Sequence, residues 1–439
     1  MSLRGHVSRI EARGLLPVPP CLWISTVTFR YIAAIALTVV LHSVAVAQTV
    51  AQDVVIDNKV PVGEPLEKAI DYFTATDFPS VIIGNGRGGV YLYRSTSNEL
   101  KGPWVRSTIA AKGSAYERSR PIKFPNDIYP DLVASISNQI VLYENPKNHG
   151  RNVTRPWTAH VVNPQHGCHD IRLEDLDGDG KTDIVCSGAI SLRAPEFVAF
   201  QQDPYHWQVV YDVADVGDDV AILRVGADSM PHLVGADPSG NIFWYENPRS
   251  RGGNARSAHW VKHFVGPGNV GNSFAAGRLQ SGKYAIVTAA NEHEGPGGST
   301  DERGITWYDQ PDDPQDPWIA HSVATSYRDV HEINLGSWNG GTPYFLVAEQ
   351  EQACDPARPE NNPPDHSGIP CRIAMFQWKN GALKEEVLAD SGTQNQVVLP
   401  WRGGLLMADA NHGAYGGSRA IHVRLILPEA AGGVVSTSP

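Results

Sequence analysis

The chain has 439 residues, of which 19% are charged, with 42 glycines, 32 prolines and a formal net charge of −11. This composition favours many short strands and turns over a helical bundle. The acidic balance argues against nucleic acid or an anionic membrane surface as a partner, so we expect no nucleic-acid binding.

Residues 1–47 have the pattern of a targeting segment. Arg30 precedes the apolar stretch YIAAIALTVVLHSVAVA, which places small residues at positions −3 and −1 before Gln48. This pattern predicts a signal peptide, or an N-terminal anchor if the segment is retained. No later stretch is long and apolar enough to span a membrane. We therefore expect an exported protein, periplasmic or secreted, with no membrane contact beyond this segment. A linker over 48–65 and a C-terminal tail over 428–439 are expected to flank the main domain.

Between residues 66 and 427 the chain repeats one pattern of strands. The segments VLYENP (141–146), FWYENP (243–248) and TWYDQP (306–311) are near copies, and each precedes a Trp-led strand such as WVKHFV (260–265). Another hairpin lies ahead of each aromatic strand. One unit is thus four short strands in roughly fifty residues, the period of a propeller blade. About seven such units predict an all-β fold, a seven-bladed β-propeller of four-stranded antiparallel blades. The least regular units are the first (66–110) and the last (394–427), where closure of the ring joins the two chain ends.

Four cysteines follow the leader segment, namely Cys168, Cys186, Cys354 and Cys371. An even number in an exported protein indicates disulfides, and three connectivities are possible. We favour Cys168–Cys186 and Cys354–Cys371, because each pair brackets a local hairpin or loop. Reduced, buried cysteines are the alternative. The spacing does not fit a zinc site.

The segment LEDLDGDGKTDIVC (173–186) concentrates carboxylates in one turn. Asp175, Asp177, Asp179 and Asp183 occupy positions 1, 3, 5 and 9 of a loop, and Lys181 at position 7 would offer its backbone carbonyl. Oxygen ligands in this arrangement suit Ca²⁺, so we predict a structural calcium ion held by these five residues. The alternative is a solvated acidic turn. Because position 12 is a cysteine and no flanking helices are apparent, the loop is not an EF-hand.

The segment DLDGDGKTDIV, together with WYENP, resembles the FG-GAP/VCBS repeat propellers over nearly all of the mature chain. Only the third unit carries the aspartate motif intact. The resemblance implies a calcium loop that joins the first two strands of a blade. It implies little about function, because the family includes adhesins, sugar-binding modules and lyases.

Polar residues gather where the repeats predict the face opposite the aspartate loop. Strands alternate in direction within a blade, so the start of the first strand and the end of the second share one face. A cluster of histidines and carboxylates at this mouth could serve acid–base chemistry or hold a second metal ion. Alternatively, its histidines form hydrogen bonds between blades. The positions concerned are Arg118, Arg120, His169, Asp170, Asp218, Asp219, Asn272, residues 291–294, His331, Glu332, Glu349, Gln350, Asp409, Asn411 and His412.

Two classes of function follow. The chain is similar to propellers that cleave uronic-acid polysaccharides by β-elimination and to the aldos-2-ulose dehydratases, which implies a carbon–oxygen lyase acting on a poly- or oligosaccharide. His169 or His331 would be the base, Arg118, Arg120 or a metal ion would stabilise the developing charge, and Tyr327 or His412 would be the acid. Glu332, beside His331, is a further candidate catalytic residue. The alternative is a non-enzymatic propeller that binds a glycan or a protein. In either case we expect a monomer, and the absence of a G-x-S-x-G elbow argues against a serine hydrolase.

Overall fold

Short runs of β-branched and aromatic residues, separated by Gly, Pro and Asn turns, form the strands of this protein. The computed structural model describes residues 52–57, 68–75, 79–84, 89–96, 103–111, 115–188, 195–225, 230–237, 239–268, 272–279, 283–290, 304–324, 327, 330–337, 343–349, 371–379, 381–392, 395–401, 404–410 and 421–427. These residues all belong to one unit, Val50–Ala430. Within them, no helix is long and apolar enough to cross a membrane. The expected targeting segment 1–47 and the tail 428–439 lie outside the described residues.

The described strands form seven four-stranded antiparallel sheets, which we number as blades in chain order. Blade 1 contains β2 (Lys68–Asp71), β3 (Ser80–Gly84), β4 (Val90–Ser95) and β5 (Trp104–Ala110). Blade 2 contains β6 (Ala115–Ile122), β7 (Asp131–Ile136), β8 (Gln139–Glu144) and β9 (Thr158–Asn163). Blade 3 contains β10 (Ile171–Glu174), β11 (Asp183–Cys186), β12 (Phe197–Asp203) and β13 (His206–Tyr211). Blades 4 and 5 contain β14 (Ala221–Arg224), β15 (Pro231–Ala236), β16 (Asn241–Glu246) and β17 (Val261–Pro267); and β18 (Asn272–Arg278), β19 (Tyr284–Ala290), β20 (Ile305–Asp309) and β21 (Ile319–Ala324). Blades 6 and 7 contain β22 (Val330–Ser337), β23 (Pro343–Glu349), β24 (Cys371–Lys379) and β25 (Ala382–Gly392); and β26 (Asn395–Trp401), β27 (Gly404–Ala410), β28 (Ile421–Leu427) and β1 (Gln52–Asp57). Two short 3-10 helices, η1 (Pro146–His149) and η2 (Pro248–Arg251), follow the third strands of blades 2 and 4.

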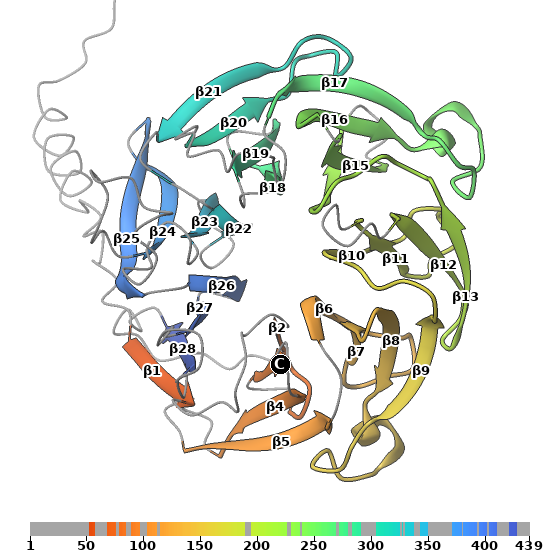
Figure 1. Cartoon of the computed structure of the whole chain (residues 1–439), viewed down its shortest axis with the longest axis vertical. Helices are drawn as coiled ribbons and strands as arrows, with labels where there is room; N and C mark the ends of the chain where they lie inside the picture. The colour runs from red at the N-terminus through yellow and green to blue at the C-terminus, as the bar shows by residue number, and fades with distance from the viewer. Residues whose placement is uncertain are drawn as a thin grey trace, which may run out of the picture. The chain divides into compact units, whose positions relative to one another are not determined.

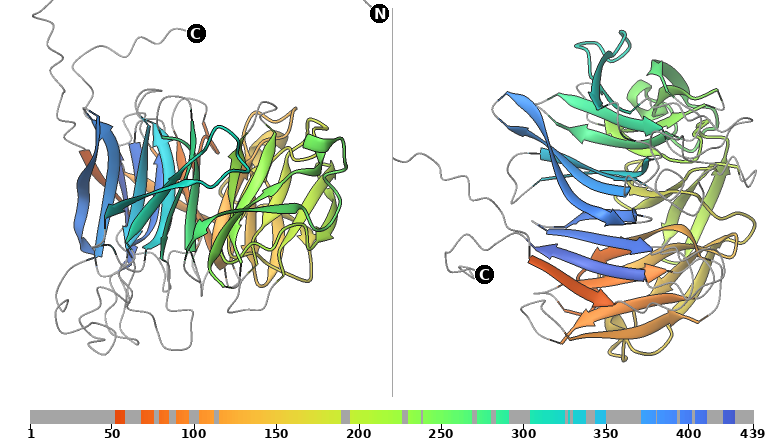
Figure 2. Two further views of the ribbon diagram at one scale, coloured as in Figure 1. Left: turned by 90° about the horizontal axis from the view of Figure 1, so that it is seen from above. Right: turned by 60° about the vertical axis from the view of Figure 1, so that its left-hand side comes forward.

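The blades form a closed ring (Figure 1). The first strand of each blade is the innermost, and it contacts the first strand of the next blade, from β2 through β6, β10, β14, β18 and β22 to β26 and back to β2. The strands run from one face of the ring to the other, so successive loops alternate between the two faces (Figure 2). These observations confirm the predicted propeller of four-stranded antiparallel blades.

The ring closes through a strand that the sequence did not reveal. β1 lies in the range 48–65 that was expected to be a linker, and it pairs antiparallel with β28 as the outermost strand of blade 7. The linker prediction was therefore wrong for residues 52–57. Pairing one chain end with the other satisfies the backbone groups of an edge that the last blade would otherwise expose.

The hydrophobic core lies between neighbouring blades. The second strands β7 and β15 are buried at every residue, because the adjacent blades cover both faces of each sheet. One cluster, for example, packs Leu142 of blade 2 against Ile171 and Ile184 of blade 3. Each blade boundary thus depends on aliphatic side chains from two units of the repeat.

The asparagine of the repeated ENP motif also joins blades. Asn145 is fully buried and donates from Nδ2 to the carbonyls of Phe73 in blade 1 and Pro130 in blade 2. Asn247 occupies the same place in blade 4 and donates to the carbonyls of Leu176 in blade 3 and Pro231 in blade 4. In blades 2 and 4 the motif therefore attaches the blade to a loop of the preceding one.

Candidate functional site

The aspartate loop joins β10 to β11 in blade 3. Glu174 pairs with Asp183 at the ends of these strands, so residues 175–182 must reverse the chain. Gly178 and Gly180 have φ values of 72° and 82°, which favour glycine. Their amides donate to the two carboxylate oxygens of Asp175, at 2.7 and 3.0 Å. The turn is thus folded around the Asp175 carboxylate.

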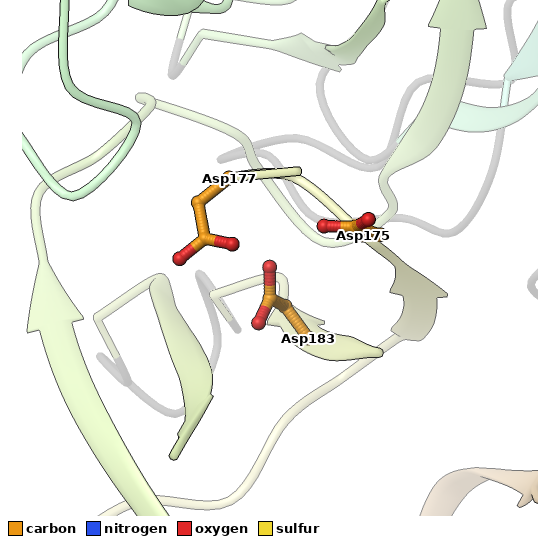
Figure 3. Close-up of side chains that lie close together, drawn as sticks. All are labelled: Asp175, Asp177 and Asp183. Carbon is orange, nitrogen blue, oxygen red and sulfur yellow. The ribbon is translucent and has the colours of Figure 1, made fainter. Parts of the chain in front are cut away.

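Three of the four aspartates point toward one another (Figure 3). One carboxylate oxygen from each of Asp175, Asp177 and Asp183 lies within 4.8 Å of the others. Asp183 is fully buried and accepts the amides of Leu176 and Gln201 at 2.9 and 3.0 Å. Burial raises the pKa of Asp183 to about 7, and the charges of Asp177 and Asp175 act in the same direction. A cation among these oxygens would offset this repulsion.

Asp179, the other predicted carboxylate ligand, does not join this group. Its carboxylate accepts the backbone amide of Lys181 at 2.9 Å and the ammonium of Lys181 at 2.7 Å. Burial acts to raise the pKa of Asp179, but the hydrogen bonds and charge of Lys181 outweigh it and lower the pKa. Of the predicted ligands, the structure therefore brings Asp175, Asp177 and Asp183 together and pairs Asp179 with Lys181.

Blade 2 provides an internal comparison for Asp183. Asp131 begins the second strand of blade 2, as Asp183 does in blade 3, and it accepts the amide of Asn145 at 2.7 Å. Burial raises the pKa of Asp131 to about 7 as well. An aspartate at the start of the second strand therefore has a structural role, because its carboxylate accepts a backbone amide at the end of the third strand. The fit to a calcium ion depends on Asp175 and Asp177, where blade 2 carries Lys123 and Pro125. Three carboxylates supply the hard oxygen donors that Ca²⁺ requires.

On the opposite face, ionic contacts run from blade 2 into blade 3. Arg120 on β6 places Nη2 3.1 Å from Oδ1 of Asp170, and Arg172 on β10 places Nη2 2.8 Å from Oδ2 of the same buried aspartate. Arg172 also donates from Nε to the carbonyl of Val220 in blade 4, at 2.7 Å. Asp170 therefore lies between two guanidinium groups and helps to join three blades.

His169 lies at the boundary with blade 4. Its Nδ1 lies 2.8 Å from the carbonyl of Asp218 and 3.5 Å from Oδ1 of Asp219. A carbonyl can only accept, so Nδ1 carries a proton and, in the neutral ring, Nε2 is the basic nitrogen. His169 is only 8% exposed. The expected hydrogen bond between neighbouring blades is present at this histidine.

The predicted Cys168–Cys186 disulfide is confirmed. It connects the residue before His169 to the end of β11, with Cα atoms 5.2 Å apart. The backbone at residues 168–170 is further fixed by Ser187, whose Oγ accepts the amide of Asp170. The Cys354–Cys371 pair lies outside the part of the chain whose side chains are described.

Tyr327, proposed as an acid, lies in the connection between blades 5 and 6, shortly before β22. Its hydroxyl donates to Oε1 of Glu385 at 2.5 Å, and the guanidinium of Arg372 lies 3.9 Å from its ring centroid. Arg372 also pairs with Glu349, with Nη2 2.8 Å from Oε1. Burial raises the pKa of Tyr327, and the hydrogen bond to Glu385 adds to the shift. The polar contacts of Tyr327 are therefore with blade 6, and its ring packs in a hydrophobic cluster that also contains Val287 and Trp307 of blade 5.

The other predicted mouth residues are described in part. Glu332 is 1% exposed. Arg118, Asn272, His331 and Asp409 lie on strands whose backbones are described, but their side chains are not. Residues 291–294, Gln350, Asn411 and His412 lie outside the described residues.

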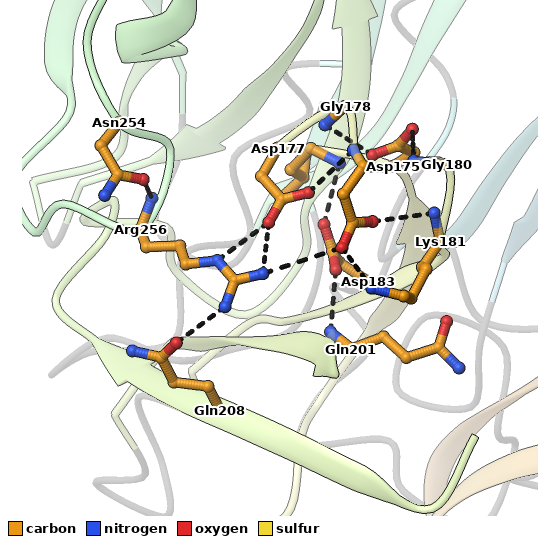
Figure 4. A network of polar contacts seen from close by, with 12 residues as sticks. Asp175, Asp177, Gly178, Gly180, Lys181, Asp183, Gln201, Gln208, Asn254 and Arg256 are labelled. Atoms are coloured by element: carbon orange, nitrogen blue, oxygen red, sulfur yellow. Dashed lines mark hydrogen bonds and ion pairs between the residues drawn. The ribbon is translucent and has the colours of Figure 1, made fainter. Parts of the chain in front are cut away.

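Besides Asn247, two arginines of blade 4 contact the aspartate loop, and sequence reasoning missed them (Figure 4 shows Arg256). Arg249 donates from Nη1 to the carbonyl of Leu176 at 3.3 Å. Arg256 donates from Nε and Nη2 to Oδ2 of Asp177, at 2.9 and 2.6 Å. These residues lie more than sixty positions beyond the loop. In the sequence, the only indication of a role was that both arginines lie between the ENP motif of blade 4 and Trp260.

A family model for the FG-GAP-like repeat matches residues 124–186, which include the aspartate loop. No curated protein matches the sequence. Similar solved structures include two crystal structures of BBS1N in complex with ARL6DN, soaked with lead and with mercury, at 10% and 12% identity. They have TM-scores of 0.48 and 0.46, and the alignments cover 87% of this chain and 98% and 99% of theirs. At these values the similarity supports no argument about function. The repeat match and the ring of four-stranded antiparallel blades together show that this chain is a β-propeller that contains an FG-GAP-like repeat.

Proposed function

We propose that this chain is a calcium-stabilised β-propeller that holds a carbohydrate on the face opposite the calcium loop. The observation that carries the calcium site is the convergence of Asp175, Asp177 and Asp183 within 4.8 Å. Calcium bound there would attach the loop to β11 and, through Leu176 and Asp177, to blade 4. Its role is structural, because the loop and the polar mouth lie at opposite ends of β10.

Calcium binding is tested by calorimetry and thermal unfolding of the mature chain after removal of metal with a chelator. We expect saturable binding of one calcium ion in blade 3 and a higher melting temperature with calcium. Asp175→Asn should abolish both effects. The matched control is Asp127→Asn in the first loop of blade 2, which should leave calcium binding unchanged. Equal melting temperatures with calcium and with chelator, and no heat of binding, would refute the site.

Binding rather than catalysis is supported by the contacts of the mouth residues. His169, Asp170 and Arg120 are all engaged with neighbouring blades. Such contacts hold these side chains in fixed positions, as a preformed binding site requires. We infer that the ligand is a poly- or oligosaccharide. The FG-GAP/VCBS propellers that the chain resembles include sugar-binding modules, and the mouth combines carboxylates, histidine and arginine that can hydrogen-bond hydroxyl groups.

The second candidate is a β-eliminating lyase or sugar dehydratase. It is favoured by His169, whose protonated Nδ1 makes Nε2 the basic nitrogen, as proton abstraction from carbon requires. Arg120, with a side chain 15% exposed, would stabilise an enolate. His331, Glu332, Arg118 and His412 remain the further candidates for this chemistry.

One assay separates the two candidates. The mature chain is incubated with calcium and a panel of uronic-acid polysaccharides and keto-sugars, and ultraviolet absorbance is followed for a new conjugated double bond. Turnover that disappears in His169→Ala but persists in His206→Ala, an exposed histidine of the same blade, would establish the lyase. A flat trace, with binding of one of the same sugars detected by calorimetry, would establish the binding propeller. A flat trace without binding would refute the carbohydrate proposal.

A further inference from the structure

Arg256 occupies part of the calcium site from the neighbouring blade. Both its Nε and its Nη2 donate to a single oxygen, Oδ2 of Asp177 (Figure 4). The other oxygen, Oδ1, accepts the amide of Asp179 at 3.2 Å. Arg256 is itself fixed by Gln208, which accepts from Nη1 at 2.8 Å. The Asp177 carboxylate therefore already has a cationic partner with a defined geometry.

The position of Arg256 belongs to a turn that recurs in other blades. In blade 4 the amide of Arg256 donates to Oδ1 of Asn254, and the indole of Trp260 donates to the carbonyl of Ala255. Blade 2 has the same turn, in which Thr154 donates to Asn152 and Trp157 to Val153. Blade 5 repeats it once more, with Gln315 donating to Asp313 and Trp318 to Pro314.

The third residue of this turn is threonine in blade 2, glutamine in blade 5 and arginine in blade 4. The backbone turn therefore does not require a charge at this position. The charged residue is found in the blade that follows the intact aspartate loop, and its guanidinium reaches that loop. The match between the one arginine and the one intact loop indicates that the charge serves the loop.

We propose that Arg256 is a built-in counter-ion, which holds Asp177 in place before calcium binds and which calcium must displace from Oδ2. The inference rests on the proposed calcium site. The guanidinium and calcium compete for the same carboxylate, and the positive charge of Arg256 opposes a second cation nearby. Arg256 therefore lowers the calcium affinity, and it preserves the shape of the loop in the metal-free protein.

The test measures calcium affinity and metal-free stability in the mature chain, using Arg256→Gln. Calorimetry after chelator treatment should give a dissociation constant about tenfold lower than that of the wild type. In chelator the variant should melt about 2 °C lower, because Asp177 has lost its partner. With saturating calcium the two melting temperatures should converge. Arg256→Lys, which keeps the charge but loses the paired donors, should bind calcium more weakly than Arg256→Gln.

Arg251→Gln is the matched control. Arg251 lies in the same blade and pairs with Glu246 rather than with the loop, so its removal should leave the calcium affinity unchanged. If the wild type binds calcium and Arg256→Gln binds it no more tightly, Arg256 is not a competitor and the inference is wrong. If neither the wild type nor Arg256→Gln binds calcium, the proposed calcium site fails, and the inference fails with it.

Discussion

Asn247 donates a hydrogen bond of 2.8 Å from Nδ2 to the backbone carbonyl of Leu176, which joins blade 4 to the aspartate loop of blade 3. The same side chain donates to Pro231 in its own blade at 3.0 Å, and it is fully buried. The aspartate loop is therefore shaped from two sides, by its own glycines and by the next blade.

Replacing Asn247 with alanine should lower the free energy of unfolding by about 2–4 kcal/mol. The change removes the side-chain donor to the Pro231 carbonyl and one of the two side-chain donors to the Leu176 carbonyl, the other being Arg249. Urea denaturation followed by tryptophan fluorescence measures the effect. Asn126→Ala, at an exposed position in blade 2, should change stability by less than about 0.5 kcal/mol. Similar losses in both variants would contradict a special role for the buried amide.

The two glycines of the aspartate loop form a matched pair. Alanine at either site must adopt a positive φ, which costs about 1 kcal/mol. A Cβ on Gly178 would lie 1.9 Å from Nη2 of Arg249, whereas nothing lies within 4 Å of a Cβ on Gly180. The flexible Arg249 would move and lose its bond to Leu176. Gly178→Ala should therefore cost about 1 kcal/mol more than Gly180→Ala.

The double variant Gly178→Ala, Arg249→Ala isolates that contact by chemical denaturation. In the Arg249→Ala background the two glycine substitutions should have equal effects on the free energy of unfolding. An excess cost of Gly178→Ala that persists without Arg249 would show that the strain arises elsewhere in the loop.

Asp131 makes stability depend on pH. Burial raises its pKa to about 7, whereas an aspartate in the unfolded chain titrates near 3.9. Because the folded-state pKa is raised, this group's contribution to stability is fully present below about pH 4 and is lost as the pH rises through about 7. Asp131→Asn keeps an oxygen for the amide of Asn145 and removes the ionisable group. Between pH 4 and 7.5 the variant should gain stability relative to the wild type by about 4 kcal/mol, because the two pKa values differ by about three units.

Urea denaturation at each pH tests this prediction. Asp312→Asn, whose side chain is 98% exposed, serves as the control and should follow the wild-type pH profile. A constant difference between Asp131→Asn and the wild type over this pH range would mean that Asp131 does not titrate there.

The Cys168–Cys186 disulfide should stabilise the segment that carries His169. It closes a loop with a sequence separation of 18, for which a loss of about 2–4 kcal/mol is expected on removal. The double variant Cys168→Ser, Cys186→Ser should melt lower than the oxidised wild type. Reducing agent should lower the melting temperature of the wild type more than that of the double variant. Equal responses to reducing agent would place the sensitive bond elsewhere.

Much of the fold could be predicted from local patterns. The WYENP copies and their Trp-led strands predicted the propeller. The alternation of strand direction predicted that His169 and the aspartate loop lie at opposite ends of β10. The strand β1 could not be predicted in this way, because it has no partner within its own unit and pairs with a strand more than 360 positions later. The role of Asp179 was also missed, since the sequence spacing does not show that its carboxylate turns to Lys181.

The sequence by itself determined the repeat, the strands and the carboxylates of one loop, because these depend on periodicity and on neighbouring residues. Only the tertiary structure decided which polar side chains contact one another. Arg256 pairs with Asp177, Arg120 and Arg172 pair with Asp170, and Tyr327 donates a hydrogen bond to Glu385. Two of these contacts cross a blade boundary. These contacts form because one repeat unit packs on the next, which brings together residues that are far apart in the sequence. A local sequence pattern cannot show which of these residues will meet.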